Sequence, residues 1–173
     1  DIHRSNWAEV ALRSRQLAQA LDRLGLAVGD RVGTLAWNGH RHLEIYYAVS
    51  GSQRVCHTIN PRLFPQQVAW IANDAQDKVI FVDLNLFPLV EKLAPELPSL
   101  QHVVLMCDRA NMPRESTVTG LLCYEDLIAA ETGEYVWPEF DEHTAASLCY
   151  TSGTTGNPKG VLYSHRSSVL HAF

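Results

Sequence analysis

A short segment near the C-terminal end of the chain combines the residue types that bind phosphate. From Thr151 to Gly160 the sequence reads T-S-G-T-T-G-N-P-K-G, with three glycines, four hydroxyl side chains and one lysine, Lys159. Glycines let backbone N–H groups turn toward an anion without obstruction by Cβ. Hydroxyls donate hydrogen bonds to phosphate oxygens, and a lysine supplies a mobile positive charge. The segment therefore predicts a cradle for a polyphosphate.

This loop differs from other glycine-rich loops. A Walker-type P-loop has glycine directly before its lysine and a hydroxyl directly after it, whereas Pro158 precedes Lys159 here and Gly160 follows. The G-x-G-x-x-G spacing of dinucleotide-binding loops and the G-x-S-x-G of hydrolase nucleophiles are also absent. A merely flexible connection is the alternative, but flexibility alone requires neither the lysine nor the proline.

Apolar periodicity indicates which elements hold this loop. Helices are expected at 7–24, 42–50, 66–75, 87–97 and 124–131, and strands at 31–37, 55–59, 78–83, 102–106 and 145–150. Such alternation predicts an α/β fold with a doubly wound, mostly parallel sheet and helices on both faces. The last strand runs directly into Thr151, so the loop lies where ligands bind in such sheets, at a strand's carboxyl end.

Composition and charge exclude several classes of protein. The 173 residues carry a net charge of −5, which argues against nucleic acid as a partner. No apolar run reaches the ~18 residues that would span a bilayer. The four cysteines form no C-x-x-C pair, which is typical of reduced thiols in a cytoplasmic protein. The charge is also uneven, because residues 143–173 hold two bases and no acid, which suits an anionic ligand.

Histidines and cysteines elsewhere do not predict a metal site. His40 and His42 are two apart and would point to different faces of a helix. Cys56 and His57 are adjacent in a strand and alternate between its faces. His165 follows the loop on the next expected helix, where a surface or capping role is favoured over contact with a phosphate or acyl group.

Other polar and aromatic residues have structural interpretations. Asp83 ends an expected strand, and without a dinucleotide fingerprint it is expected to cap that strand rather than to hold a ribose. The aromatic residues Trp37, Tyr46, Tyr47 and Trp70 lie on apolar faces, which predicts core packing.

The loop also carries a family resemblance. Residues 150–161, Y-T-S-G-T-T-G-N-P-K-G-V, resemble at every position the phosphate-loop signature of the adenylate-forming enzymes, which include acyl-CoA synthetases, peptide-synthetase adenylation domains and beetle luciferases. Segments 38–47, 56–64, 71–83 and 161–166 resemble the medium- and long-chain fatty acyl-CoA synthetases. The resemblance therefore covers nearly the whole chain.

The resemblance implies an ATP-dependent fatty acyl-CoA ligase. A carboxylate would attack the α-phosphate of ATP to give an acyl-adenylate and pyrophosphate, and coenzyme A would then form the thioester. Mg²⁺ would assist the first step. Lys159 would have the catalytic role of neutralising the departing pyrophosphate. The residues expected to wrap the β- and γ-phosphates are Thr151, Ser152, Gly153, Thr154, Thr155, Gly156 and Lys159.

The resemblance also implies a domain organisation. Residues 1–173 would be part of the large N-terminal, ATP-binding domain, with the rest of that domain and a C-terminal domain outside the chain. The chain alone is then expected to be inactive, and a homodimer is left open. Three alternatives remain: a non-catalytic nucleotide- or phosphate-binding module, an adenylate-forming ligase for short or aryl acids, and an interaction fragment with exposed apolar surface.

Overall fold

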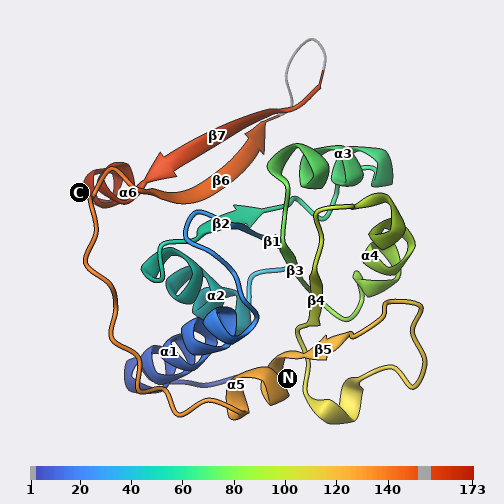
Figure 1. The fold of residues 1–173 in the computed structure, drawn as a ribbon, viewed down its shortest axis with the longest axis horizontal. Coiled ribbons are helices and arrows are strands. Elements are labelled where there is room, and N and C mark those ends of the chain that lie inside the picture. Colours follow the sequence, from blue (N-terminus) through green and yellow to red (C-terminus); the bar gives the residue numbers. More distant parts are fainter. Residues whose placement is uncertain (1–2, 152–156) are drawn as a thin grey trace.

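A computed structural model describes residues 3–151 and 157–173, and its centre is one seven-stranded sheet (Figure 1). The strands are β1 (Arg31–Leu35), β2 (Val55–Thr58), β3 (Val79–Val82), β4 (His102–Leu105), β5 (Leu122–Cys123), β6 (Ala145–Thr151) and β7 (Lys159–Ser164). They lie in the order β5-β4-β3-β1-β2-β6-β7. All neighbouring pairs are parallel except β6 and β7, which form an antiparallel hairpin. The predicted, mostly parallel sheet is confirmed.

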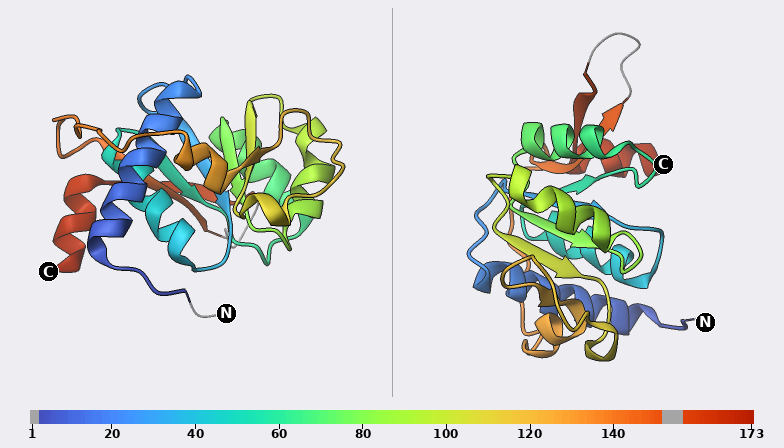
Figure 2. Two further views of the ribbon diagram at one scale, coloured as in Figure 1. Left: turned by 90° about the horizontal axis from the view of Figure 1, so that it is seen from below. Right: turned by 90° about the vertical axis from the view of Figure 1, so that its right-hand side faces the viewer.

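Helices cover both faces of this sheet (Figures 1 and 2). One face packs against α1 (Trp7–Arg23), α2 (His40–Gly51) and α5 (Tyr124–Ala129), and the other against α3 (Pro65–Ala75) and α4 (Phe87–Leu93). The 3₁₀ helices η1 (Ala94–Glu96) and η2 (Arg109–Asn111) lie in connections, and α6 (His165–Ala172) follows β7. No helix within the described ranges is both long and apolar enough to cross a membrane.

The pleat of the central strands explains the two cores. Alternate residues of β3 fall on opposite faces, so Phe81 joins the core under α1 and α2, while Ile80 and Val82 join the core under α3 and α4. All four residues of β3 are buried, as expected for a strand covered on both faces. Burial on both faces therefore fixes the register of this central strand.

The connections from β1 and β2 leave toward opposite faces of the sheet. The chain passes from β1 through α2 to β2 on one face, and from β2 through α3 back past β1 to β3 on the other. Connections that diverge in this way open a crevice outside the carboxyl ends of the strands. Because β6 pairs in parallel with β2, its carboxyl end at Thr151 lies on the same edge.

Some local predictions differ from the structure. The expected helix at 87–97 ends as α-helix at Leu93 and continues as a 3₁₀ turn, and the two-residue strand β5 was not predicted. The prediction of core packing is wrong for Trp37, Tyr46 and Tyr47, whose side chains are 41%, 39% and 50% exposed. Trp70 alone among these aromatics packs against a core, the one under α3 and α4.

Candidate functional site

The structure places the two ends of the predicted phosphate loop opposite each other. Thr151 ends β6 and pairs with Lys159, which begins β7. Residues directly opposite in an antiparallel pair project from the same face of the hairpin. Both residues are exposed, so a hydroxyl and an ammonium are available to one ligand. The other predicted loop residues, Ser152, Gly153, Thr154, Thr155 and Gly156, lie outside the part of the chain that the structure describes.

A cavity of about 660 Å³ opens beside Thr151 at the carboxyl ends of β1, β2 and β6. It occupies the crevice created by the diverging connections. Its wall carries polar side chains that can donate or accept hydrogen bonds. These include Asn38, Thr58, Asn60, Arg62 and Thr151. The site therefore has room for a small molecule next to the predicted phosphate contacts.

A second cavity, of about 630 Å³, continues along the hairpin toward α6. The two cavities share Tyr46, Thr58 and Cys149 on their walls. The Thr58 hydroxyl and the Cys149 thiol lie 3.3 Å apart and link β2 to β6 at this boundary. The open space thus follows the face of the hairpin that carries Thr151.

Tyr150 anchors the opposite face of the hairpin to α3. Its hydroxyl donates a 2.6 Å hydrogen bond to Oδ2 of Asp74. Burial first, and then the hydrogen bond to Asp74, raise the pKa of Tyr150 well above its ordinary value of 10.0. The hydroxyl therefore stays protonated and keeps donating at neutral pH. The sequence did not predict this pair. The position of Tyr150 directly before Thr151 was the one feature that pointed to a role for Tyr150 near the loop.

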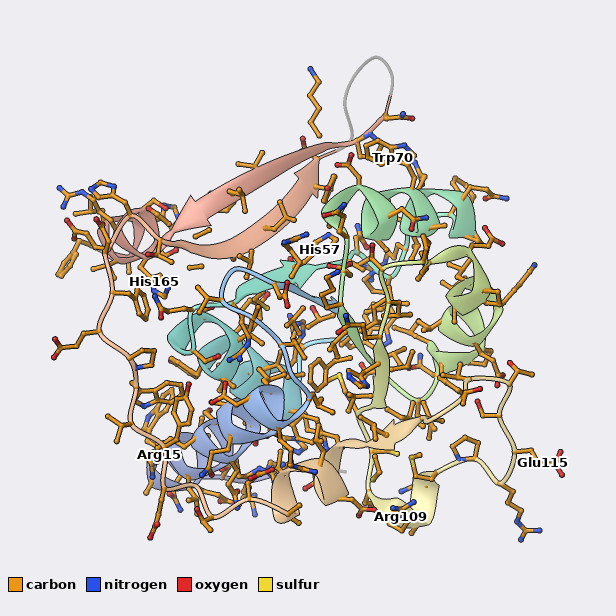
Figure 3. The ribbon with its side chains drawn as sticks, viewed as in Figure 1. Arg15, His57, Trp70, Arg109, Glu115 and His165 are labelled. Carbon is orange, nitrogen blue, oxygen red and sulfur yellow. The ribbon has the colours of Figure 1, made fainter. Side chains whose placement is uncertain are left out.

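A buried His–Asp pair lies beside Tyr150, under β2. Nδ1 of His57 is 2.8 Å from Oδ2 and 2.9 Å from Oδ1 of Asp77, and both side chains are buried. Burial raises the pKa of Asp77, although the hydrogen bond from His57 opposes that rise. Within the described residues, Nε2 of His57 has no hydrogen-bond partner. Figure 3 labels His57 beneath the hairpin, between β6 and the body of the sheet.

The remaining residues considered from the sequence have structural contacts. His42 is buried, with Nδ1 3.2 Å from the Trp37 carbonyl oxygen and Nε2 3.1 Å from the Thr34 hydroxyl. The carboxylate of Asp83, which follows β3, accepts a 2.7 Å hydrogen bond from the backbone N–H of Trp37, so it caps the end of the neighbouring strand β1 instead of its own strand. In the described ranges, no three His, Cys, Asp or Glu side chains come together as a metal site.

His165 lies at the far end of the hairpin from Lys159 (Figure 3). It begins α6, and its ring is 4.8 Å from the ring of Phe140. Burial lowers its pKa, which favours the neutral imidazole. The structure therefore does not bring His165 to the loop, and the helix end itself is capped by Ser164, whose hydroxyl accepts from the Ser167 N–H.

The fold and this edge of the sheet define the class of protein. All 173 residues match the family model described as AMP-binding enzyme, and the chain belongs to that family. It is 55% identical over 172 residues to a 3-methylmercaptopropionyl-CoA ligase of Ruegeria lacuscaerulensis, covering 99% of this chain and 32% of that protein. It is 53% identical to a medium-chain-fatty-acid–CoA ligase of Ectopseudomonas oleovorans, covering 99% of this chain and 31% of that protein.

A solved structure shares the same arrangement. The crystal structure of the anthranilate CoA ligase AuaEII in complex with anthranoyl-AMP matches with a TM-score of 0.86 at 27% identity, covering 95% of this chain and 30% of that one. The resemblance to adenylate-forming enzymes is thereby confirmed for the family and the fold. The chain spans about a third of the length of the curated relatives it matches.

Proposed function

We propose that this chain supplies the phosphate-binding edge of the ATP site in an AMP-forming acid–thiol ligase. One observation carries the proposal: Thr151 and Lys159 face the same side of a hairpin, beside a 660 Å³ cavity at the carboxyl ends of parallel strands. A hydroxyl and a cation at a strand's carboxyl end suit an anionic ligand. The absence of acidic residues from 143 to 173 adds to the attraction for anions.

The proposed reaction has two balanced steps. A substrate carboxylate oxygen attacks the α-phosphorus of ATP, the bond to the β-phosphate bridging oxygen breaks, and pyrophosphate leaves. The sulfur of coenzyme A then attacks the acyl carbon, its proton is released, and AMP departs as the thioester forms. The first step mainly requires the protein to stabilise the negative charge on the departing pyrophosphate.

In this scheme Lys159 stabilises negative charge instead of moving a proton. A lysine ammonium is a compact point charge on a flexible stem, which suits a group that neutralises leaving pyrophosphate. The hydroxyl of Thr151 would donate a hydrogen bond to a phosphate oxygen. The roles of Ser152, Gly153, Thr154, Thr155 and Gly156 around the β- and γ-phosphates stay predictions.

The side chains near the loop fit Mg²⁺ bound through ATP. Mg²⁺ keeps several waters and is held by few protein oxygens together with substrate phosphates. Thr151 offers one such oxygen and lines the cavity. When bound, Mg²⁺ supplies neutralising charge on the phosphates. No carboxylate at the described ends of the loop would be needed for that arrangement.

The substrate acid is proposed by class. The names of the two relatives describe ligases for a short sulfur-containing acid and for medium-chain fatty acids. We propose a medium-chain fatty acid as substrate, with short and aryl acids as the alternatives. A cytoplasmic location, a homodimer and placement of residues 1–173 in a larger N-terminal domain stay predictions alongside it.

Pyrophosphate exchange tests the proposal. The full protein that contains this chain is incubated with ATP, labelled pyrophosphate and a panel of medium-chain, short sulfur-containing and aryl acids. The proposal predicts label in ATP only when an acid is present, with the fastest exchange for a medium-chain acid. Exchange that is independent of every acid, or no exchange with any of them, would contradict it.

A non-catalytic nucleotide-binding module is the second candidate. In such a module the exposed Thr151 and Lys159 would contact a polyphosphate without chemistry. Titration calorimetry with ATP distinguishes the two, because saturable binding by residues 1–173 together with no exchange in the full protein favours the module.

A further inference from the structure

Tyr150 lies where the hairpin meets α3. It directly precedes Thr151 on β6, and its hydroxyl donates to the Asp74 carboxylate at 2.6 Å. Its ring also meets the edge of Trp70 in a T-shaped contact, with centroids 6.1 Å apart. Asp74 and Trp70 both belong to α3, so two contacts from one helix hold one side chain. This helix is itself packed on the core through Val68, Ile71 and Ala72.

The Tyr150 ring also packs against β7, the second strand of the hairpin. Tyr150 is paired with Gly160, the residue after Lys159. A Cβ at position 160 would lie 3.1 Å from Cζ and 3.3 Å from the hydroxyl oxygen of Tyr150. Because glycine has no Cβ, the ring lies directly over β7 at that point. The Tyr150 side chain therefore joins β6 to β7 one residue pair before Thr151 and Lys159.

A rigid part of the sheet supports the ring from the other side. The ring of His57 lies 5.2 Å from that of Tyr150 and is tilted by 52°. His57 is fully buried and is fixed by Asp77. Leu148, also on β6, packs with Val55 and Ala75 and with the partly buried Tyr150. Tyr150 thus has little freedom once its hydroxyl is bound to Asp74.

We propose that Tyr150 is a positioning residue, and that its hydrogen bond to Asp74 sets Thr151 and Lys159 for a polyphosphate. The ligand in this inference rests on the proposed function, whereas the effect of the hydrogen bond on the hairpin does not. Groups held in place before binding lose less conformational freedom when the ligand arrives. Tyr150 and Asp74 act on the ligand through the hairpin.

Steady-state pyrophosphate exchange by the full protein tests the positioning role. Tyr150→Phe keeps the ring and removes the hydroxyl, so the KM for ATP should rise about three- to tenfold, the range of one hydrogen bond. The KM for the acid should not change. Asp74→Ala should have the same effect, while Asp74→Asn, which keeps an oxygen acceptor, should restore most of the affinity. The double variant Tyr150→Phe/Asp74→Ala should be no worse than either single one.

The matched control is Glu115→Ala, an exposed carboxylate on a loop far from the hairpin (Figure 3). It should leave both KM values unchanged. An unchanged KM for ATP in Tyr150→Phe, in an active enzyme, overturns the inference. Equal loss of kcat for all substrates without a change in KM also overturns it, because that result indicates a purely structural role.

Tryptic cleavage after Lys159 gives a readout that does not depend on ligase activity. Loss of the hydrogen bond should raise the cleavage rate at Lys159 several-fold in Tyr150→Phe and Asp74→Ala, while cleavage after Lys92 on α4 stays the same. Unchanged cleavage at Lys159 overturns the inference. If the parent protein shows no exchange but the variants are cleaved faster, the ligase proposal fails and the effect of Tyr150 on the hairpin is supported.

Discussion

Gly33 lies in β1 against the carboxylate of Asp77. A Cβ at this position would be 2.9 Å from Oδ2 of Asp77 and 3.2 Å from Cγ1 of Ile80. The glycine thereby leaves the space in which Asp77 reaches His57 beneath the sheet. Because Asp77 is 2% exposed and Ile80 is 1% exposed, neither neighbour can move into solvent without opening the core.

Gly33→Ala should destabilise the chain. Displacing Asp77 overpacks the core and strains a buried hydrogen bond, which together cost about 1–3 kcal/mol. Urea unfolding of the 173-residue chain, followed by tryptophan fluorescence, measures the loss. The control is Gly39→Ser, at the N-cap of α2, where a Cβ meets nothing within 4 Å and serine caps well. A Gly33→Ala chain as stable as the parent would contradict the packing account.

The sequence predicted the residues proposed to contact the ligand, but it did not predict the residues that hold them in place. Thr151 and Lys159 belong to a continuous motif whose residue types indicate phosphate. Asp74 and Tyr150 are 76 residues apart, and nothing local pairs them. The exposed Trp37, Tyr46 and Tyr47 were misassigned because a pattern of apolar residues does not show which face the sheet covers.

Helices α1, α2 and α5 are joined by a charged network at one end of the sheet. Arg13 of α1 donates from Nε to Glu44 of α2 at 2.7 Å and from Nη1 to Glu125 of α5 at 2.9 Å. Arg41 donates to the same Glu125 at 2.7 Å. Tyr124 donates to Glu44 at 2.7 Å, so the buried carboxylate has two partners. The network fixes α2, which follows β1 at the carboxyl edge where the cavity opens.

This network predicts acid sensitivity. Burial raises the pKa of Glu125, but the hydrogen bonds from Arg13 and Arg41 outweigh it and leave the pKa below its ordinary value of 4.5. A lowered folded-state pKa adds stability that is present above 4.5 and is lost as the pH falls through the folded value. Glu125→Gln should therefore lower stability at neutral pH and flatten its decline in acid.

Urea midpoints of the chain measured from pH 3 to pH 7 check this prediction. Glu115→Gln, an exposed carboxylate on the loop after η2, is the matched control and should keep the parent's acid decline. If the stability of Glu125→Gln falls with pH as steeply as that of the parent, the network does not contribute to the pH dependence of stability.

Element type followed from periodicity where elements were long. The amphipathic pattern predicted α1, and the Asn6 side chain caps its start by accepting a hydrogen bond from the Glu9 N–H at 3.0 Å. The two residues of β5 are too few to show a pattern, and their pairing with β4 depends on tertiary contact. The network of Arg13 and Glu125 joins residues 112 apart, which sequence alone cannot pair.

At the scale of the whole molecule, the hairpin and α6 leave apolar side chains in solvent. Leu162, Val169 and Leu170 have exposed fractions of 61%, 57% and 57%. The relatives are about three times as long as this chain, since it spans about a third of their length.

The 173-residue chain alone should therefore show no ligase activity. We expect no acid-dependent pyrophosphate exchange and no thioester formation with medium-chain acids, because part of the site cannot complete the transition-state contacts. Exchange assays on the chain and on the full protein, run side by side, check this. Measurable acid-dependent exchange by the chain alone would contradict the domain organisation proposed for it.

Rapid-quench kinetics of Lys159→Ala in the full protein test the phosphate-binding account most directly. Loss of one preorganised cationic contact should slow acyl-adenylate formation about a hundredfold. Thioester formation from preformed acyl-adenylate should change little, because pyrophosphate has already left. Lys92→Ala, an exposed lysine on α4, is the control and should leave both steps unchanged. Equal slowing of the two steps, or no slowing of either, would contradict the role assigned to Lys159.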